Sequence, residues 1–122
     1  MGVLGLHHVQ LAAPRGCEDE ARRFFGEVLG LVELDKPEAL RARGGVWFAV
    51  GRQQLHIGVE EPFAPALKAH PALRVADGEL DAFADRLAAA GADVRWDDAL
   101  ADARRFYTRD PWGNRLELLA FM

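Results

Sequence analysis

The feature that most constrains this 122-residue chain is an internal repeat of about 61 residues. Three pairs of residues recur at nearly one offset, 61 residues for the first two pairs and 62 for the third: Gly30 and Gly91, Leu55 and Leu116, Gly51 and Gly113. A small chain can show a loose strand–helix rhythm by coincidence, but coincidence does not explain a shared offset. Self-similarity at a fixed period indicates one structural unit used twice. We therefore predict two modules in tandem.

The pattern of apolar residues predicts the same order of elements in both modules, because alternation indicates strands and a 3.6-residue period indicates helices. The first module is expected to form a strand at 6–13, a helix at 18–29, and strands at 31–34, 46–50 and 54–59. The second is expected to form a strand at 72–75, a helix at 79–90, and strands at 93–96, 105–109 and 115–121. The predicted fold class is α+β, with the order strand, helix and three strands occurring twice.

Each predicted helix has one apolar face that should pack against its sheet. The residues of that face are Ala21, Phe24, Phe25, Val28 and Leu29 in the first helix and Leu80, Phe83, Ala84, Leu87 and Ala88 in the second. We expect a single domain over 1–122, with a first module at about 1–60 and a second at about 70–122. The connection at about 61–69 contains Pro62 and Pro65, which make it stiff rather than flexible.

Composition narrows the class of protein further. Half of the residues are hydrophobic, 28% are charged and the formal net charge is −4, which is typical of a globular domain and gives no support to nucleic-acid binding or a polybasic membrane anchor. No apolar run approaches a membrane span of roughly 20 residues, and the N-terminus lacks a signal-peptide pattern. The single cysteine, Cys17, cannot form an internal disulfide and is interpreted as structural. We therefore expect a cytoplasmic protein without a nucleic-acid or membrane partner.

Three of the four histidines and one glutamate occupy equivalent places in the two modules. His8 and His70 lie near the start of the first strand of each module, and His56 and Glu117 lie in the last strand. Strand alternation places each of them on the face opposite the apolar residues that should pack under the helix. If each sheet curls, these faces line a groove in which the four groups can converge. His7 points the other way and is not a candidate.

Imidazole nitrogens together with a carboxylate suit zinc, nickel, iron(II) or manganese. Each histidine taken alone is better interpreted as a satisfied polar residue on a half-exposed strand, but the set of four favours a divalent transition metal. The sequence therefore predicts His8, His56, His70 and Glu117 as metal ligands. It does not decide which of the four metals binds.

Several other residues are candidates for contact with a small-molecule substrate. Gln10 and Arg74 share the groove face with the predicted ligands, Tyr107 can donate a hydrogen bond to a substrate or simply pack, and Trp47 can line the pocket or lie in the core. Three cations before the third strand, Lys36, Arg41 and Arg43, could meet an anionic substrate, although a solvated loop is the simpler interpretation.

Three stretches resemble the vicinal oxygen chelate (VOC) superfamily, also called the glyoxalase/bleomycin resistance protein/dioxygenase family. They are His8-Val9-Gln10-Leu11, Phe24-Phe25-Gly26-Glu27-Val28-Leu29-Gly30-Leu31, and Phe106-Tyr107 with Asp110-Pro111-Trp112-Gly113-Asn114-Arg115-Leu116-Glu117. The resemblance covers nearly the whole chain, and the last stretch is the most specific. It implies paired βαβββ modules whose curved sheets surround a metal-binding groove. It also implies a homodimer in which His8 and His56 of one subunit share a metal with His70 and Glu117 of the other; a site within one chain is equally consistent with the sequence.

The resemblance implies several alternative activities, because one scaffold hosts several chemistries. The first is a glyoxalase I-like lyase or isomerase acting on a small metabolite or thiol adduct, with Glu117 moving a proton beside a carbonyl. Such enzymes usually carry Glu or Gln where this chain has His56, so Glu117 is the only acid–base group among the four. Extradiol-type dioxygenases and fosfomycin-type thiol transferases fit the triad His8, His70 and Glu117 as well. A metal-free small-molecule binding protein of the bleomycin resistance type is the further alternative.

Overall fold

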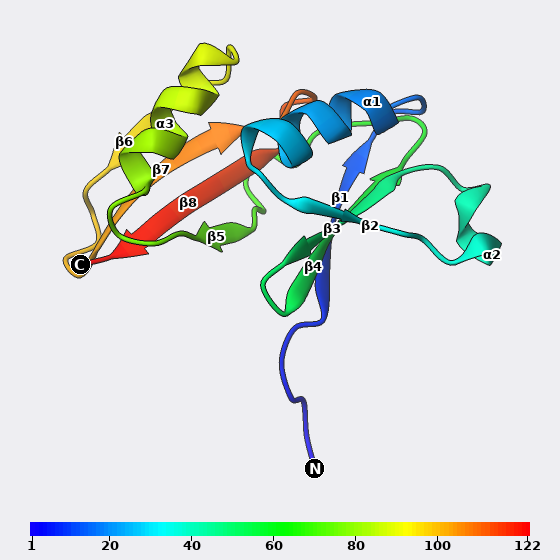
Figure 1. Ribbon diagram of the computed structural model, residues 1–122, viewed down its shortest axis with the longest axis horizontal. Helices are drawn as coiled ribbons and strands as arrows, with labels where there is room; N and C mark the ends of the chain where they lie inside the picture. The colour runs from blue at the N-terminus through cyan, green and yellow to red at the C-terminus, as the bar shows by residue number, and fades with distance from the viewer. The chain divides into compact units, whose positions relative to one another are not determined.

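The computed structural model describes all residues from 1 to 122, which divide into two compact units, Met1–Ala64 and Pro65–Met122. Each unit contains one four-stranded mixed sheet with its helices (Figure 1). None of the helices has both the length and the apolar character needed to cross a bilayer. The structure confirms the predicted α+β class and the predicted order of strand, helix and three strands in each unit.

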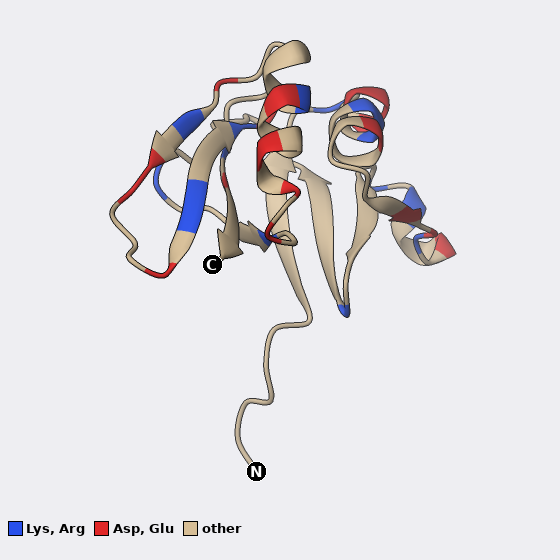
Figure 2. Ribbon diagram, turned by 60° about the vertical axis from the view of Figure 1, so that its left-hand side comes forward, with Lys and Arg blue, Asp and Glu red and all other residues tan.

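The first unit contains strands β1 (His8–Ala13), β2 (Val32–Leu34), β3 (Val46–Val50) and β4 (Gln53–Val59). They lie in the order β1-β4-β3-β2, with β1 parallel to β4 and the other pairs antiparallel. A short helix that the sequence did not predict, α2 (Glu38–Arg41), lies between β2 and β3. Residues 1–7 precede β1 as a segment without Lys, Arg, Asp or Glu that extends away from this sheet (Figure 2).

The predicted helix at 18–29 differs from the observed one in its winding. It begins as α1 (Glu18–Ala21) and continues as a π-helical segment, η1 (Arg22–Val28). The amide of Leu29 donates to the carbonyl of Phe24, five residues earlier, at 3.0 Å. Apolar spacing identifies a helix with one buried face, but it does not distinguish the α from the wider π winding. Phe24 and Phe25 are both buried as predicted, whereas Val28 is only half-buried.

The second unit contains β5 (Ala72–Arg74), β6 (Arg95–Asp97), β7 (Ala103–Arg109) and β8 (Arg115–Phe121), with helix α3 (Leu80–Ala89). The strands lie in the order β5-β8-β7-β6, so β5 and β8 form the parallel pair. This repeats the topology of the first unit strand for strand. Helix α3 buries Leu80, Ala84 and Leu87, but Ala88, predicted to share this face, is exposed.

The core of each unit lies between its sheet and its helix. In the first unit Phe25, Phe48, Leu55 and Ile57 are fully buried, and in the second Leu87, Phe106, Leu116 and Leu118 are. Burying a side chain of this size contributes roughly 1.5–3 kcal/mol. Apolar residues of β4 and β8 thus face the core while His56 and Glu117 project from the opposite face, as strand alternation predicts.

Candidate functional site

The two sheets present their candidate ligands at equivalent positions of the register. In the first unit His56 of β4 lies between Gln10 of β1 and Trp47 of β3. In the second, Glu117 of β8 lies between Ala72 of β5 and Tyr107 of β7. His8 precedes Gln10 by two residues, and His70 precedes Ala72 by two. Each sheet therefore brings one pair of candidate ligands to the same place on the same face.

Three aromatic rings stack in the first unit. The ring of His56 lies 4.0 Å from that of Trp47, with 3° between the planes, and 4.2 Å from that of His8, with 14° between the planes. The imidazole of His56 is thus enclosed between two flat groups, and only 4% of the residue is exposed. This stacking fixes the orientation of the His56 imidazole plane.

The surroundings of His56 also fix its charge and its tautomer. Burial, together with the charges of His8, His7 and Lys36, lowers the pKa of His56 to about 4, so the ring is neutral at pH 7. Its Nε2 lies 2.8 Å from the side-chain oxygen of Gln54, which can only accept a hydrogen bond. The proton therefore sits on Nε2, and Nδ1 retains the lone pair that a metal would need.

His7 takes part in this cluster, contrary to the prediction that it points away. Its Nδ1 lies 2.9 Å from Nδ1 of His8, and the two rings meet edge to face at 5.2 Å. Residue alternation failed here because His7 precedes β1, which begins at His8, so its side chain is not held to the strand's alternation. His7 is a neighbour that orients His8.

In the second unit His70 and Glu117 are in direct contact. Nε2 of His70 lies 3.0 Å from Oε1 of Glu117, and Glu117 is only 5% exposed. On the other side of the ring, Nδ1 of His70 donates to the carbonyl oxygen of Lys68 at 2.9 Å. A neutral His70 therefore has its lone pair on Nε2, facing a carboxylate oxygen. Two acceptors this close require a shared cation, either a proton or a metal ion.

Arg105 of β7 belongs to this cluster, although the sequence analysis did not identify it. Its guanidinium donates to Oε2 of Glu117 at 3.4 Å and to Asp97 at 3.2 and 3.3 Å. The arginine thus holds one carboxylate oxygen of Glu117 and leaves the other for His70. Strand alternation could have found it, because Arg105 lies two residues before Tyr107 and shares its face.

The predicted substrate-contacting residues lie at different distances from these pairs. The ring of Tyr107 meets that of His70 edge to face at 5.5 Å, so it borders the candidate ligands. The side chain of Gln10 lies over Gly58, where a Cβ atom would come within 2.6 Å of its amide nitrogen. The guanidinium of Arg74 lies instead over the ring of Phe121 at 5.3 Å.

The donor set of each pair fits a divalent metal. Both pairs offer a lone pair on a ring whose other nitrogen is hydrogen-bonded to an oxygen, which is the usual outer contact of a metal-bound histidine. Each unit contributes two of the four predicted ligands, and within neither unit do three or more His, Cys, Asp or Glu side chains gather to hold an ion. A complete set of ligands thus requires both pairs, and their convergence on one ion stays a prediction.

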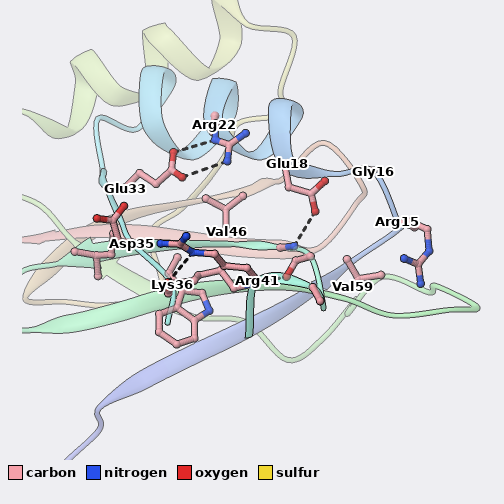
Figure 3. A pocket seen from close by; sticks show the side chains of 15 residues that line it. Arg15, Gly16, Glu18, Arg22, Glu33, Asp35, Lys36, Arg41, Val46 and Val59 are labelled. Atoms are coloured by element: carbon pink, nitrogen blue, oxygen red, sulfur yellow. Dashed lines mark hydrogen bonds and ion pairs between the residues drawn. The ribbon is translucent and has the colours of Figure 1, made fainter. Parts of the chain in front are cut away.

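A pocket of about 590 Å³ opens in the first unit next to the ring stack (Figure 3). Trp47 forms part of its wall, together with the predicted cations Lys36 and Arg41 but not Arg43. Figure 3 shows two polar contacts that frame it: Arg22 with Glu33 at 2.9 Å, and the amide of Gly45 donating to Glu18 at 2.7 Å. Its volume falls in the range of small-molecule sites.

The family model described as Glyoxalase/Bleomycin resistance protein/Dioxygenase superfamily matches residues 5–118 of the chain. Among curated proteins none matches. A solved glyoxalase family protein from Bacillus anthracis is 48% identical, and the match covers 100% of this chain and 98% of that one with a TM-score of 0.94.

More distant structures share the fold. The fosfomycin resistance protein FosX from Listeria monocytogenes is 17% identical, with 99% of this chain and 96% of that chain covered and a TM-score of 0.80. Lactoylglutathione lyase from Agrobacterium tumefaciens is 22% identical, with 95% and 92% covered and a TM-score of 0.74. At this level of identity the likeness concerns architecture alone.

Proposed function

Because the chain belongs to the glyoxalase/bleomycin resistance protein/dioxygenase superfamily, we propose that it is a metal-dependent enzyme of the glyoxalase I-like type. It would act as a lyase or isomerase on a small metabolite or a thiol adduct. Members of this family commonly use divalent metals and act on small molecules. The metal would be zinc, nickel, iron or manganese, held by His8, His56, His70 and Glu117.

The contact between His70 and Glu117 carries this proposal. The backbone carbonyl of Lys68 accepts a hydrogen bond from Nδ1 of His70, and Nε2 of the same ring faces Oε1 of Glu117 at 3.0 Å. A proton or a metal ion can occupy the space between these two atoms, so the pair can act as two metal ligands once Nε2 is deprotonated. A ring whose outer nitrogen is fixed by a carbonyl is the arrangement that metal-binding histidines use, and it supports the proposal.

The metal and the residues around it would have separate roles in the reaction. A bound divalent ion would supply Lewis-acid stabilisation of the negative charge that develops on substrate oxygens. Glu117 would move a proton at the carbon beside the carbonyl, and Arg105 would hold the carboxylate in place through Oε2. The stacked Trp47 would hold the imidazole plane of His56 in one orientation and exclude water from that side of the ring.

Metal analysis of protein purified without a histidine tag tests this proposal. We expect close to one transition-metal ion per set of four ligands, and loss of most of it in Glu117→Gln and His70→Ala. Glu27→Gln, which changes an exposed glutamate of η1, is the matched control and should retain the metal. A wild-type protein with less than about half an equivalent of metal, unchanged by these substitutions, would favour a metal-free binding or resistance protein.

A second experiment addresses the reaction. Metal-loaded protein should consume the hemithioacetal of methylglyoxal and glutathione if the substrate is a thiol adduct of this kind. Oxygen uptake with catechols and iron(II) would indicate a dioxygenase instead. Activity with neither substrate, in a protein that binds metal, would direct the search to other vicinal-oxygen substrates.

We also propose a homodimer in which each set of ligands combines His8 and His56 of one subunit with His70 and Glu117 of the other. Co-expression of a His8→Ala chain with a Glu117→Gln chain tests it. Shared sites would leave one of the two sites in the mixed dimer intact and restore metal binding there. Sites within single chains would leave every site defective, so no metal binding would return.

A further inference from the structure

The second unit contains a smaller pocket in which two of the three arginines have no ion pair. Its volume is about 200 Å³, and its lining includes Arg95, Arg109 and Arg115 with Tyr107, Leu67 and a single acid, Asp93. It shares Tyr107 with the surroundings of His70. The pocket therefore adjoins the candidate ligands of this unit.

Two of these arginines face each other across neighbouring strands. Arg109 of β7 and Arg115 of β8 are direct partners in the antiparallel register. Like charges in this position destabilise a sheet unless something compensates for them. Here the compensation is weak: Arg109 donates to the carbonyl of Gly113 at 3.0 Å, and Arg115 lies over the ring of Tyr107 at 4.0 Å. Neither arginine has a carboxylate within ion-pair distance.

The other two arginines of β7 have carboxylate partners. Arg104 forms an ion pair with Asp81 at 3.0 Å, and Arg105 pairs with Asp97 and Glu117. Arg95, the third cation of the pocket, reaches only Asp93 at 3.8 Å, and both side chains are largely exposed. Within β7, positive charge without a carboxylate partner is thus confined to Arg109, which lines this pocket.

We propose that the pocket binds an oxyanion, a carboxylate or phosphate group, through Arg109 and Arg115 with support from Arg95. Planar guanidinium groups bind such oxyanions with two parallel hydrogen bonds each. Two facing arginines in a pocket of about 200 Å³ match one oxyanion attached to a short chain of atoms. The largely exposed side chain of Leu67, which also lines the pocket, suits an apolar portion of the same ligand.

The register places this oxyanion site beside the proposed reacting centre. Arg115 precedes Glu117 by two residues on one strand and shares its face, so their Cα atoms lie roughly 7 Å apart along β8. Resting on the proposed function, this assigns the substrate class: a small molecule that carries a carboxylate or phosphate group in addition to the atoms that react near Glu117.

Titration of metal-free protein with inorganic phosphate, and separately with acetate, tests the proposal by following backbone amide NMR signals. We expect saturable shifts at 107–109 and 115, and an affinity at least about tenfold weaker in Arg115→Gln and Arg109→Gln. Arg104→Gln changes an arginine of the same strand outside the pocket and should bind phosphate normally. Tighter binding of phosphate than acetate would assign a phosphate substrate, and the reverse order a carboxylate.

Equal phosphate affinity in all three variants, or no saturable shift at these residues, would overturn the proposal. Preserved amide dispersion in each variant shows that the unit remains folded. Metal content is measured on the same samples. Metal binding without a phosphate site would refute the subsite alone, whereas a phosphate site in a protein that never takes up metal would refute the proposed enzyme alone.

Discussion

The two sheets place a pair of polar side chains at the same point and surround it with different chemistry. In the first unit the pair is His8 and His56, stacked with Trp47 and bearing no net charge at pH 7 on the central ring. In the second the pair is His70 and Glu117, held by Arg105. The register position is shared, but the aromatic stack of one unit corresponds to an ionic network in the other.

This difference shows which parts of the repeat are fixed by geometry. Strand alternation decides where the two pairs point, and it acts equally in both units. The neighbours of each pair on the chain segment of β3 or β7 then decide what stabilises it. β3 carries Trp47 and β7 carries Tyr107 at the equivalent position. Two residues earlier the chain has Gly45, just before β3, in the first unit and Arg105, within β7, in the second.

The largest effect on stability is expected when the first unit receives a carboxylate at the position that Glu117 occupies in the second. His56→Glu buries a negative charge beside Trp47, where Gly45 stands in place of the cation that Arg105 supplies to Glu117. We expect a loss of about 3 kcal/mol in the free energy of unfolding at pH 7, measured by urea denaturation. The neutral variant His56→Gln should lose clearly less. Equal losses in both variants would mean that charge does not distinguish the two units.

Removing the cation from the second unit should have the next largest effect. Arg105→Met leaves Glu117 buried without the guanidinium that contacts Oε2, and we expect a loss of about 2 kcal/mol in the free energy of unfolding. Asp97→Asn is the control, since it removes the other acid partner of Arg105 but preserves its contact with Glu117. If Asp97→Asn proves as costly as Arg105→Met, the ion pair with Glu117 is not the important one.

A subtler change compares the two aromatic neighbours. Trp47→Phe reduces the ring that stacks on His56 at 4.0 Å, and we expect a loss of about 1 kcal/mol in thermal or urea unfolding. Tyr107→Phe keeps the ring that meets His70 edge to face and removes only a hydroxyl, so it should cost less. The reverse order would show that the stack contributes little to the first unit.

The smallest expected effect depends on pH. Glu18 and Glu79 lie 61 residues apart at the starts of the two helical segments, but only Glu18 accepts a hydrogen bond from a distant amide, that of Gly45 at 2.7 Å. This bond lowers the pKa of Glu18 below its usual 4.5. Its stabilisation is therefore present above pH 4.5 and is lost as the pH falls through the folded-state pKa.

We expect Glu18→Gln to cost about 0.5 kcal/mol at pH 7 and progressively less toward pH 3, and Glu79→Gln to cost almost nothing at either pH. Urea midpoints of the two variants and the wild type across this range measure the difference. A Glu18→Gln penalty that does not change with pH would show that the side chain acts through packing rather than through its charge.

Much of the fold could be predicted from the sequence because its main signals are local. The offset between Gly30 and Gly91 and the alternation around His56 and Glu117 depend only on chain position and strand geometry. The predicted ends of β3 and β8 match the structure, and those of the other strands differ from it by one or two residues. The helix α2 was not predicted, since a four-residue element carries little periodicity. The π winding of η1 was missed because apolar spacing does not report helical pitch.

The candidate site could be predicted only in part. Residue type and alternation identify His8, His56, His70 and Glu117, but the contact that orients His70 comes from the backbone oxygen of Lys68. Every residue has a backbone carbonyl, so the identity of residue 68 does not predict this contact. Arg105 was missed for a different reason. Strand alternation places it on the face of Tyr107 and places Arg104, which pairs with Asp81, on the other face, but arginines are common on exposed strands and only the contact with Glu117 assigns Arg105 to the site.

The positions of the candidate ligands within each sheet have a consequence for exchange kinetics. Glu117 and His56 lie on interior strands, whereas His8 lies on the edge strand β1 and His70 lies two residues before the three-residue edge strand β5. Edge strands open locally at a small fraction of the cost of global unfolding. Amide hydrogens of β5 should accordingly exchange with solvent well before those of β8. Under the proposed function, the ligands at the edges, His8 and His70, would therefore release an ion before His56 and Glu117 do.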